Sequence, residues 1–171
     1  MDRKLNSFSI CSIVFFNPTQ KIHLEESLAY QDLSRVLDPL LPTENLIYAL
    51  RIDGVFEYIK TRSVPRQKKP YPKLMEVVKT QPVFEFKNVR GTLIGFRFPH
   101  YMKGLNVPGY HFHFLTDDRK GGGHVLDWKI DDMDIKIAEV PAFHMVIPRT
   151  DEFYKIDLSQ DKTTDLVKVE K

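Results

Sequence analysis

Three of the chain's six histidines lie close together in the segment GYHFHFLTDDRKGGGHVLDW, which covers residues 109–128. One phenylalanine separates His111 from His113, and His124 follows a run of three glycines. Imidazole is the commonest metal ligand among side chains, and three protein nitrogens with a fourth position left open are typical of a catalytic zinc ion. The cluster therefore predicts a metal site, provided that the chain folds so that the three rings converge.

Two adjacent strands would bring these rings together. Alternate residues of a strand point to the same side, so we expect His111 and His113 on one face of the first strand. The opposite face would be apolar and would consist of Tyr110, Phe112 and Phe114.

In the second strand the same alternation places His124 on one side together with Leu126 and Trp128. The turn TDDRKGGG joins the two strands, and its glycines allow positive φ and close backbone approach. The aromatic residues of both strands are expected to pack in the core, and the charged residues of the turn to be solvated.

A simpler interpretation of the histidines remains open at this point. An isolated His-x-His pair on a strand is usually exposed or hydrogen-bonded and binds no metal. A third histidine on a paired strand favours the metal site. The other histidines are not expected to join it, because His23 lies in a polar segment and His100 follows a proline in a loop. His144 alternates within a predicted late strand, where it is a core residue or a neighbour of the site.

The expected fold class is α+β and strand-rich, with mixed or antiparallel sheets and one or two short helices. From Val83 onward, alternating apolar and polar residues recur between turn residues, up to the segment FHMVIP at 143–148. Before this region, NLIYALRIDGVFEYIKTRSV predicts a hairpin with strands at 45–51 and 55–64 and a turn at Asp53–Gly54.

Three shorter elements are predicted from local patterns. Residues 8–16 are expected to form a buried strand that ends before Pro18. Apolar residues between positions 28 and 40 have roughly helical spacing, and LMEVVKTQ predicts one or two turns of helix.

Length and composition indicate one soluble, globular domain over residues 1–171, with 42% hydrophobic and 28% charged residues. The net charge of +2 is too small to favour nucleic acid as a partner. The apolar run near the N-terminus is too short to span a bilayer, so no membrane is expected either. The single cysteine, Cys11, excludes an internal disulfide and fits a reducing compartment such as the cytoplasm.

The longest motifs of the chain resemble those of the α-acetolactate decarboxylase family. The resemblance runs from about Ser7 to at least Pro148. It is carried by the segments GTLIGFRFPHYMKGLNVPGYHFHFLTDDRKGGGHVLDW, NLIYALRIDGVFEYIKTRSVPRQKKPYP and LMEVVKTQPVFEFKNVRGT.

The resemblance implies a function for individual residues. His111, His113 and His124 would be ligands of a zinc ion, and Arg62, in KTRSV, would be the active-site arginine. Without the resemblance, Arg62 would be interpreted as a surface residue at a strand end.

The implied reaction is that of a carboxy-lyase, the conversion of (S)-2-acetolactate into (R)-acetoin in acetoin and butanediol biosynthesis. Loss of carbon dioxide leaves an electron pair that must be delocalised into the neighbouring ketone, which zinc would assist as a Lewis acid. The planar guanidinium of Arg62 would orient the carboxylate or stabilise the enediolate. The small molecule 2-acetolactate is the expected partner, with assembly into a homodimer left open.

The chain departs from the family pattern at its ends. The family has a further N-terminal segment with an active-site glutamate, which residues 1–16 do not match, so we expect an N-terminally truncated member with an uncovered sheet edge and apolar face. A second family glutamate corresponds by counting to Glu170, which is otherwise an exposed residue of a polar tail.

Two other interpretations therefore remain open. One is a catalytically impaired, zinc-binding remnant of the enzyme. The other is a cupin-like site for iron or manganese, for which His144 is the one candidate for an additional histidine.

Overall fold

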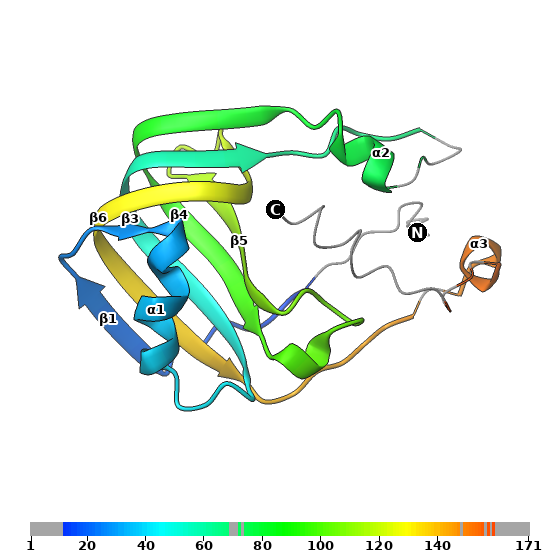
Figure 1. Cartoon of the computed structure of the whole chain (residues 1–171), viewed down its shortest axis with the longest axis horizontal. Coiled ribbons are helices and arrows are strands. Elements are labelled where there is room, and N and C mark those ends of the chain that lie inside the picture. The colour runs from blue at the N-terminus through cyan, green and yellow to red at the C-terminus, as the bar shows by residue number, and fades with distance from the viewer. Residues whose placement is uncertain are drawn as a thin grey trace.

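The computed structural model describes residues 12–68, 72, 74–147, 149–155, 157 and 159. Most of this region is a single six-stranded, antiparallel sheet with short helical segments (Figure 1). The expected strand-rich α+β fold is thereby confirmed. No helix in the described residues is long and apolar enough to cross a membrane.

The strands differ greatly in length. In chain order they are β1 (Gln20–Leu24), β2 (Leu28–Ala29), β3 (Ile47–Arg62), β4 (Val83–Phe98), β5 (Gly109–Thr116) and β6 (Gly122–Val140). The α-helices are α1 (Leu33–Leu37), α2 (Leu74–Val78) and α3 (Asp151–Tyr154), and the 3-10 helices are η1 (Tyr30–Asp32), η2 (Asp38–Leu40) and η3 (His100–Met102).

Strands β6, β3, β4 and β5 close into a small barrel. They are neighbours in that order, and β5 pairs back onto β6 from His113 to Leu115. β1 and β2 extend the sheet beyond β6, and α1 packs beside them (Figure 1). This closure leaves one face of each barrel strand directed to a common interior.

The interior is apolar and continuous. Phe56, Leu93, Phe112 and Trp128 belong to one buried cluster, and Leu37 of α1 belongs to it as well. Burial of an aliphatic or aromatic side chain of this size contributes about 1.5–3 kcal/mol, so this cluster is the main source of stability for the strands that carry the histidines.

The predicted hairpin turn at Asp53–Gly54 is wrong. β3 continues through both residues and pairs with β4 on one side and β6 on the other. A Cβ at Gly54 would lie 2.5 Å from Ile130 Cδ1 and 2.6 Å from the carbonyl oxygen of Asp132. The glycine is therefore needed for close packing inside the sheet and not for a turn.

Side chains do not alternate strictly between the two faces along residues 55–63 of the predicted strand. The register between β3 and β6 shifts near Phe56 and again after it, so Phe56 and Ile59 both reach the core. The separate strands expected after Val83 merge in a similar way, since β4 and β6 are each one continuous strand. The helical stripe is confirmed only in part, as α1 with a 3-10 turn on each side.

Two predicted strands are absent from the described residues. Residues 12–16 have no regular structure and are mostly exposed, with Ile13 88% exposed, and residues 8–11 lie outside the described part. Residues 143–147 also have no regular structure and are exposed. The chain leaves β6 there and runs away from the barrel to α3 (Figure 1). Alternation of apolar residues was misleading at both places because it does not reveal whether a partner strand is available.

A charged group links the middle strands on the outer surface of the sheet. The Asp53 carboxylate accepts hydrogen bonds from Arg51 Nε at 2.9 Å, Thr92 Oγ1 at 2.7 Å and Lys136 Nζ at 3.0 Å. Burial alone would raise the pKa of Asp53, but these hydrogen bonds from three strands outweigh it and lower the pKa.

The Asp53→Asn variant should lose about 1–2 kcal/mol of unfolding free energy at neutral pH, because its neutral amide is a weaker acceptor from these cations. A lowered pKa in the folded chain means that the contribution is complete above the ordinary aspartate pKa and disappears as the pH falls through the folded-state value. Urea unfolding at pH 7 and in acid measures both. Equal stabilities at pH 7, or a deficit that persists unchanged in strong acid, would contradict the role of Asp53.

Candidate metal centre

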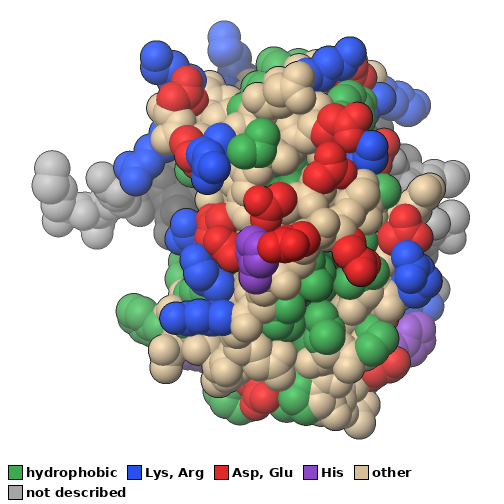
Figure 2. Space-filling view, turned by 90° about the vertical axis from the view of Figure 1, so that its left-hand side faces the viewer, with side chains coloured by type: hydrophobic (Ala, Val, Ile, Leu, Met, Phe, Trp, Pro, Cys, Tyr) green, Lys and Arg blue, Asp and Glu red, His purple; other side chains and the backbone are tan. Residues whose placement is uncertain are grey.

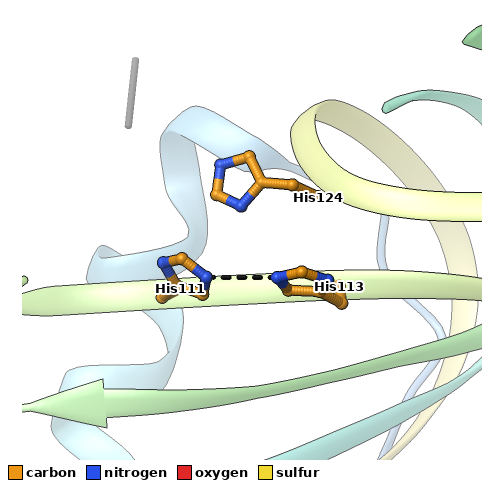
Figure 3. A group of neighbouring side chains, drawn as sticks. All are labelled: His111, His113 and His124. Carbon is orange, nitrogen blue, oxygen red and sulfur yellow. Dashed lines mark hydrogen bonds between the residues drawn. The ribbon is translucent and has the colours of Figure 1, made fainter. Parts of the chain in front are cut away.

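The three histidines converge on the outer face of the barrel, where β5 meets β6. His113 and His124 are direct cross-strand partners, and His111 lies two residues along β5 on the same face (Figure 3). One ring nitrogen of each histidine lies within 4.8 Å of the other two. The convergence that the sequence predicted is therefore present.

The spacing of the nitrogens suits a small metal ion. His111 Nε2 and His113 Nε2 are 3.3 Å apart. Two imidazole nitrogens that bind one tetrahedral zinc ion at about 2.0–2.1 Å lie about 3.3–3.4 Å from each other. Three neutral imidazoles also form a donor set that zinc accepts, and His113 is exposed, so one side of the cluster is open to solvent. The cluster can therefore hold a metal ion with a position left for a substrate.

The apolar face behind the histidines is confirmed. Phe112 and Phe114 alternate with the histidines on β5 and are buried. On β6 the prediction is wrong in one respect, because Val125 shares the core with Trp128, whereas His124 points to the opposite face. The register shift at this point of the β3–β6 ladder inserts an extra residue between Val125 and Trp128.

A tight turn holds β5 and β6 in register. The Thr116 backbone N–H donates to the Gly121 carbonyl at 2.9 Å, and Thr116 Oγ1 lies 2.6 Å from an Asp118 carboxylate oxygen. This contact and the Lys120 backbone N–H lower the pKa of Asp118, which is fully exposed. The charged residues of the turn therefore serve its structure and are solvated, as expected.

Gly123 brings the turn close to β3. A Cβ on this residue would lie 2.5 Å from the carbonyl oxygen of Arg62, and its φ of +149° is rarely adopted by other residues. The glycine thus permits the backbone of β6 to approach Arg62 immediately before His124. Gly122 permits a similar approach on the other side, since a Cβ there would lie 2.3 Å from the carbonyl oxygen of Phe114 on β5.

Arg62 lies directly beside the histidines. It is the last residue of β3 and the cross-strand partner of His124 on β6. Directly opposed residues of an antiparallel pair point to the same face, so the guanidinium projects toward the histidine side. Arg62 is only 8% exposed, which contradicts the interpretation as a surface residue at a strand end.

The remaining predicted site residue, Glu170, lies outside the described residues. The expectation that His144 is a core residue is wrong, because it lies in the exposed segment after β6. His100 is exposed in η3, as its position in a loop suggested.

His23 belongs to a different group on the far edge of the sheet. Figure 2 looks onto the side of the molecule that carries β1 and shows acidic side chains gathered around a histidine. His23 Nδ1 lies 3.0 Å from Asp134, and His23 Nε2 lies 3.5 Å from Asp132 and 3.6 Å from Glu25. The hydrogen bond to Asp134 and the surrounding charges raise the pKa of His23. Its two ring nitrogens point to different acids, so this group links β1 to β6 by charge.

One set of polar residues near the site was not predicted. Arg97 and Tyr110 both donate hydrogen bonds to Asp38 near the N-terminal end of β5. A faint signal exists in the sequence, because Arg97 and Tyr110 occupy positions whose alternation points into the apolar interior. The partner, Asp38, comes from a distant helical segment that local patterns cannot connect to them.

Comparison with known proteins agrees with this geometry. The family model described as alpha-acetolactate decarboxylase matches residues 3–160. The alpha-acetolactate decarboxylase of Methanosarcina mazei is 48% identical over 160 residues, which are 94% of this chain and 56% of that protein. The Bacillus subtilis enzyme is 40% identical over 86% of this chain and 58% of its own length.

Solved structures show the same fold. The crystal structure of acetolactate decarboxylase from Bacillus subtilis subspecies spizizenii matches with a TM-score of 0.87 and 36% identity, over 92% of this chain and 68% of that one. A Staphylococcus aureus protein of unknown function, similar to alpha-acetolactate decarboxylase, gives a TM-score of 0.82 and 29% identity, over 91% and 67% of the two chains.

The chain therefore spans somewhat more than half the length of the curated relatives that it matches. The match extends over nearly all of this chain, in sequence and in structure, and includes the strands that carry the histidines and Arg62. The chain belongs to the α-acetolactate decarboxylase family.

Proposed function

We propose that this chain carries the zinc site and the active-site arginine of an α-acetolactate decarboxylase. The reaction would convert (S)-2-acetolactate into (R)-acetoin and carbon dioxide, in acetoin and butanediol biosynthesis. The observation that carries the proposal is the convergence of His111, His113 and His124 beside the buried Arg62, in a chain that matches the family model over residues 3–160.

The three histidines would hold the metal, and zinc fits them best. The donor set is purely nitrogen, and the separation of 3.3 Å between His111 Nε2 and His113 Nε2 agrees with tetrahedral zinc coordination. A bound zinc ion would supply Lewis-acid stabilisation for negative charge that develops on the substrate's hydroxyl and carbonyl oxygens. A cupin-like iron or manganese site is less well supported, because His144 does not approach the cluster in the described structure and those metals usually take a carboxylate as well.

Arg62 would position the reacting group. The bond between the carboxylate and the tertiary carbon breaks, carbon dioxide leaves, and the electron pair moves into the adjacent ketone to give an enediolate. A guanidinium has a permanent charge and two parallel N–H donors, which suit a carboxylate before the reaction or an enediolate oxygen after it. Because Arg62 is buried, water would screen this interaction little.

The protein must also deliver one proton to the enediolate carbon, on a single face. On the basis of the family resemblance, we propose that the glutamate of the family's N-terminal segment, which residues 1–16 do not match, is the main contributor to this step, with Glu170 as a second acidic residue of the active site. Phe112 and Phe114 are buried behind the histidines and restrict the movement of the strand that carries them. The face of the substrate that receives the proton would be set by Arg62 and the acid together.

We further propose that residues 1–171 form one domain of the family's fold. The exposed apolar residues in 13–16 and 143–147 are suited to packing against polypeptide that the relatives contain beyond the match. The same residues favour the alternative, a zinc-binding remnant with impaired catalysis, when this chain is studied by itself. They also favour self-association, so a homodimer is part of the proposal.

The substrate and location follow from the same reasoning. The only partner proposed besides a second copy is the small molecule 2-acetolactate, with no role for nucleic acid or a membrane. The single cysteine supports placing the chain in a reducing compartment, the cytoplasm.

Replacement of Arg62 by lysine should abolish catalysis while leaving metal binding intact. The ammonium keeps the charge but cannot reproduce the planar pair of donors, so kcat/KM should fall by about 10²-fold or more. The measurement requires an active background, such as this chain extended by the N-terminal segment of a full-length relative. Arg66→Lys, in the exposed loop after β3, is the matched control. Equal activity of the Arg62→Lys and Arg66→Lys variants would indicate that Arg62 has only a structural role.

The 171-residue chain itself should form acetoin from racemic acetolactate slowly. A missing acid or base group typically costs 10²–10⁴-fold, so we expect a rate at least about two orders of magnitude below that of a full-length relative. The assay uses zinc-loaded protein, with His113→Ala as the blank. A rate equal to that of the full-length enzyme would show that the further segment is dispensable. A rate no higher than the blank would favour the remnant.

A further inference from the structure

We propose that Tyr110, Asp38 and Arg97 form a positioning group for His111, the ligand that the β5–β6 hairpin does not hold directly. This inference rests on the proposed metal site and adds three residues that act on it through the backbone of β5. None of the three would touch the metal or the substrate.

The group is a partly buried triangle of side chains in which Tyr110 and Arg97 both donate hydrogen bonds to Asp38. The Tyr110 hydroxyl donates to Asp38 Oδ1 at 2.8 Å, and Arg97 Nε donates to the same oxygen at 3.2 Å. Arg97 Nη1 donates to the Glu44 carbonyl oxygen at 2.8 Å. Arg97 is only 7% exposed and Asp38 is partly buried, so these contacts are partly shielded from water and are worth more than similar contacts on the surface.

The triangle connects three parts of the fold. Arg97 on β4 and Tyr110 on β5 are cross-strand partners, and Asp38 begins η2, directly after α1. Leu37, the residue before Asp38, is fully buried in the main core. The hydrogen bond to Asp38 therefore connects the phenol of Tyr110 to η2, an element whose position is already fixed by the packing of Leu37 in the core.

His111 depends on the hydrogen bond between Tyr110 and Asp38 because of its position on β5. Within the ladder to β6, β5 pairs only from His113 to Leu115, whereas its pairing with β4 extends from Gly109 to Thr116. His113 and His124 face each other inside the β5–β6 ladder, and His111 lies beyond its end, across from Phe96 of β4. The hairpin thus sets two ligands, whereas the third depends on the pairing of β5 with β4 and on the side chains next to it.

Tyr110 is adjacent to His111 and points to the opposite face of β5. A fixed Tyr110 side chain therefore restricts both the sliding and the rotation of the strand at His111. Removal of the Tyr110–Asp38 hydrogen bond should leave the fold intact but allow His111 a wider range of positions. Partners that orient a metal ligand typically contribute 10–100-fold to metal affinity.

The test is a cobalt(II) titration of the full chain, followed by competition with zinc. Tyr110→Phe and Asp38→Ala should each bind both metals about 10-fold more weakly than the unchanged chain, with a weaker or shifted tetrahedral cobalt absorption band. Asp38→Asn keeps an acceptor oxygen and should recover most of the affinity. Asp38→Ala alters no residue of β5, so it remains informative if Tyr110→Phe folds poorly.

Tyr48→Phe is the matched control. The Tyr48 hydroxyl is also in a partly buried hydrogen bond, to the Thr43 carbonyl at 2.8 Å. Tyr48 lies on β3 opposite Arg97, but β4 separates it from the histidine strand and its hydroxyl bonds to Thr43 instead of Asp38. Its variant should lose similar stability and keep full metal affinity. Equal losses of affinity in Tyr48→Phe and Tyr110→Phe, or no loss in Tyr110→Phe and Asp38→Ala, would overturn the positioning role. Absence of metal binding by the unchanged chain would overturn the metal site as well.

Discussion

The cross-strand pairing of His113 with His124 is the contact on which the rest of the structure depends. It belongs to the short ladder that joins β5 to β6 and closes the barrel. The same ladder gives the core a complete wall, since Phe114 and Val125 on its inner side belong to the buried cluster. The stability of the fold and the candidate metal centre are therefore linked, because any change that disrupts the β5–β6 ladder separates the ligands and exposes the core.

The two faces of the histidine strand carry different kinds of side chain because of the geometry of a strand. Side chains alternate across a sheet, so one short segment can place histidines outside and aromatic residues inside. The aromatic residues hold the backbone while the polar side stays accessible. Arg62 enters the same face through the pairing of β3 with β6, and Gly123 permits the close approach that this requires. Within the described residues, the three histidines and Arg62 thus come from three strands of one barrel.

The sequence contained enough information for β5 and its histidine face. Alternation there is regular, the glycine run marks the turn, and the ligands are close in the chain. The same kind of signal failed at Asp53–Gly54, because a glycine needed for packing against Ile130 looks the same as a glycine in a turn. His124 was assigned to the same face of β6 as Trp128, because the register shift between β3 and β6 has no local signature in the sequence. Burial of Arg62 and its place beside His124 depend on contacts between distant segments, and only the family resemblance indicated them.

The central claim is that His111, His113 and His124 bind one zinc ion together. X-ray absorption at the zinc edge of the zinc-loaded chain, with metal content measured on the same sample, tests it most directly. We predict about one zinc per chain, with three imidazole nitrogens at about 2.0–2.1 Å and one oxygen ligand from water. This signal should be lost in His113→Ala and at acid pH, where imidazoles protonate. His100→Ala, which alters an exposed histidine of η3, should change nothing. A spectrum with fewer than three imidazoles, or zinc content that is unchanged in His111→Ala, His113→Ala and His124→Ala, would contradict the claim.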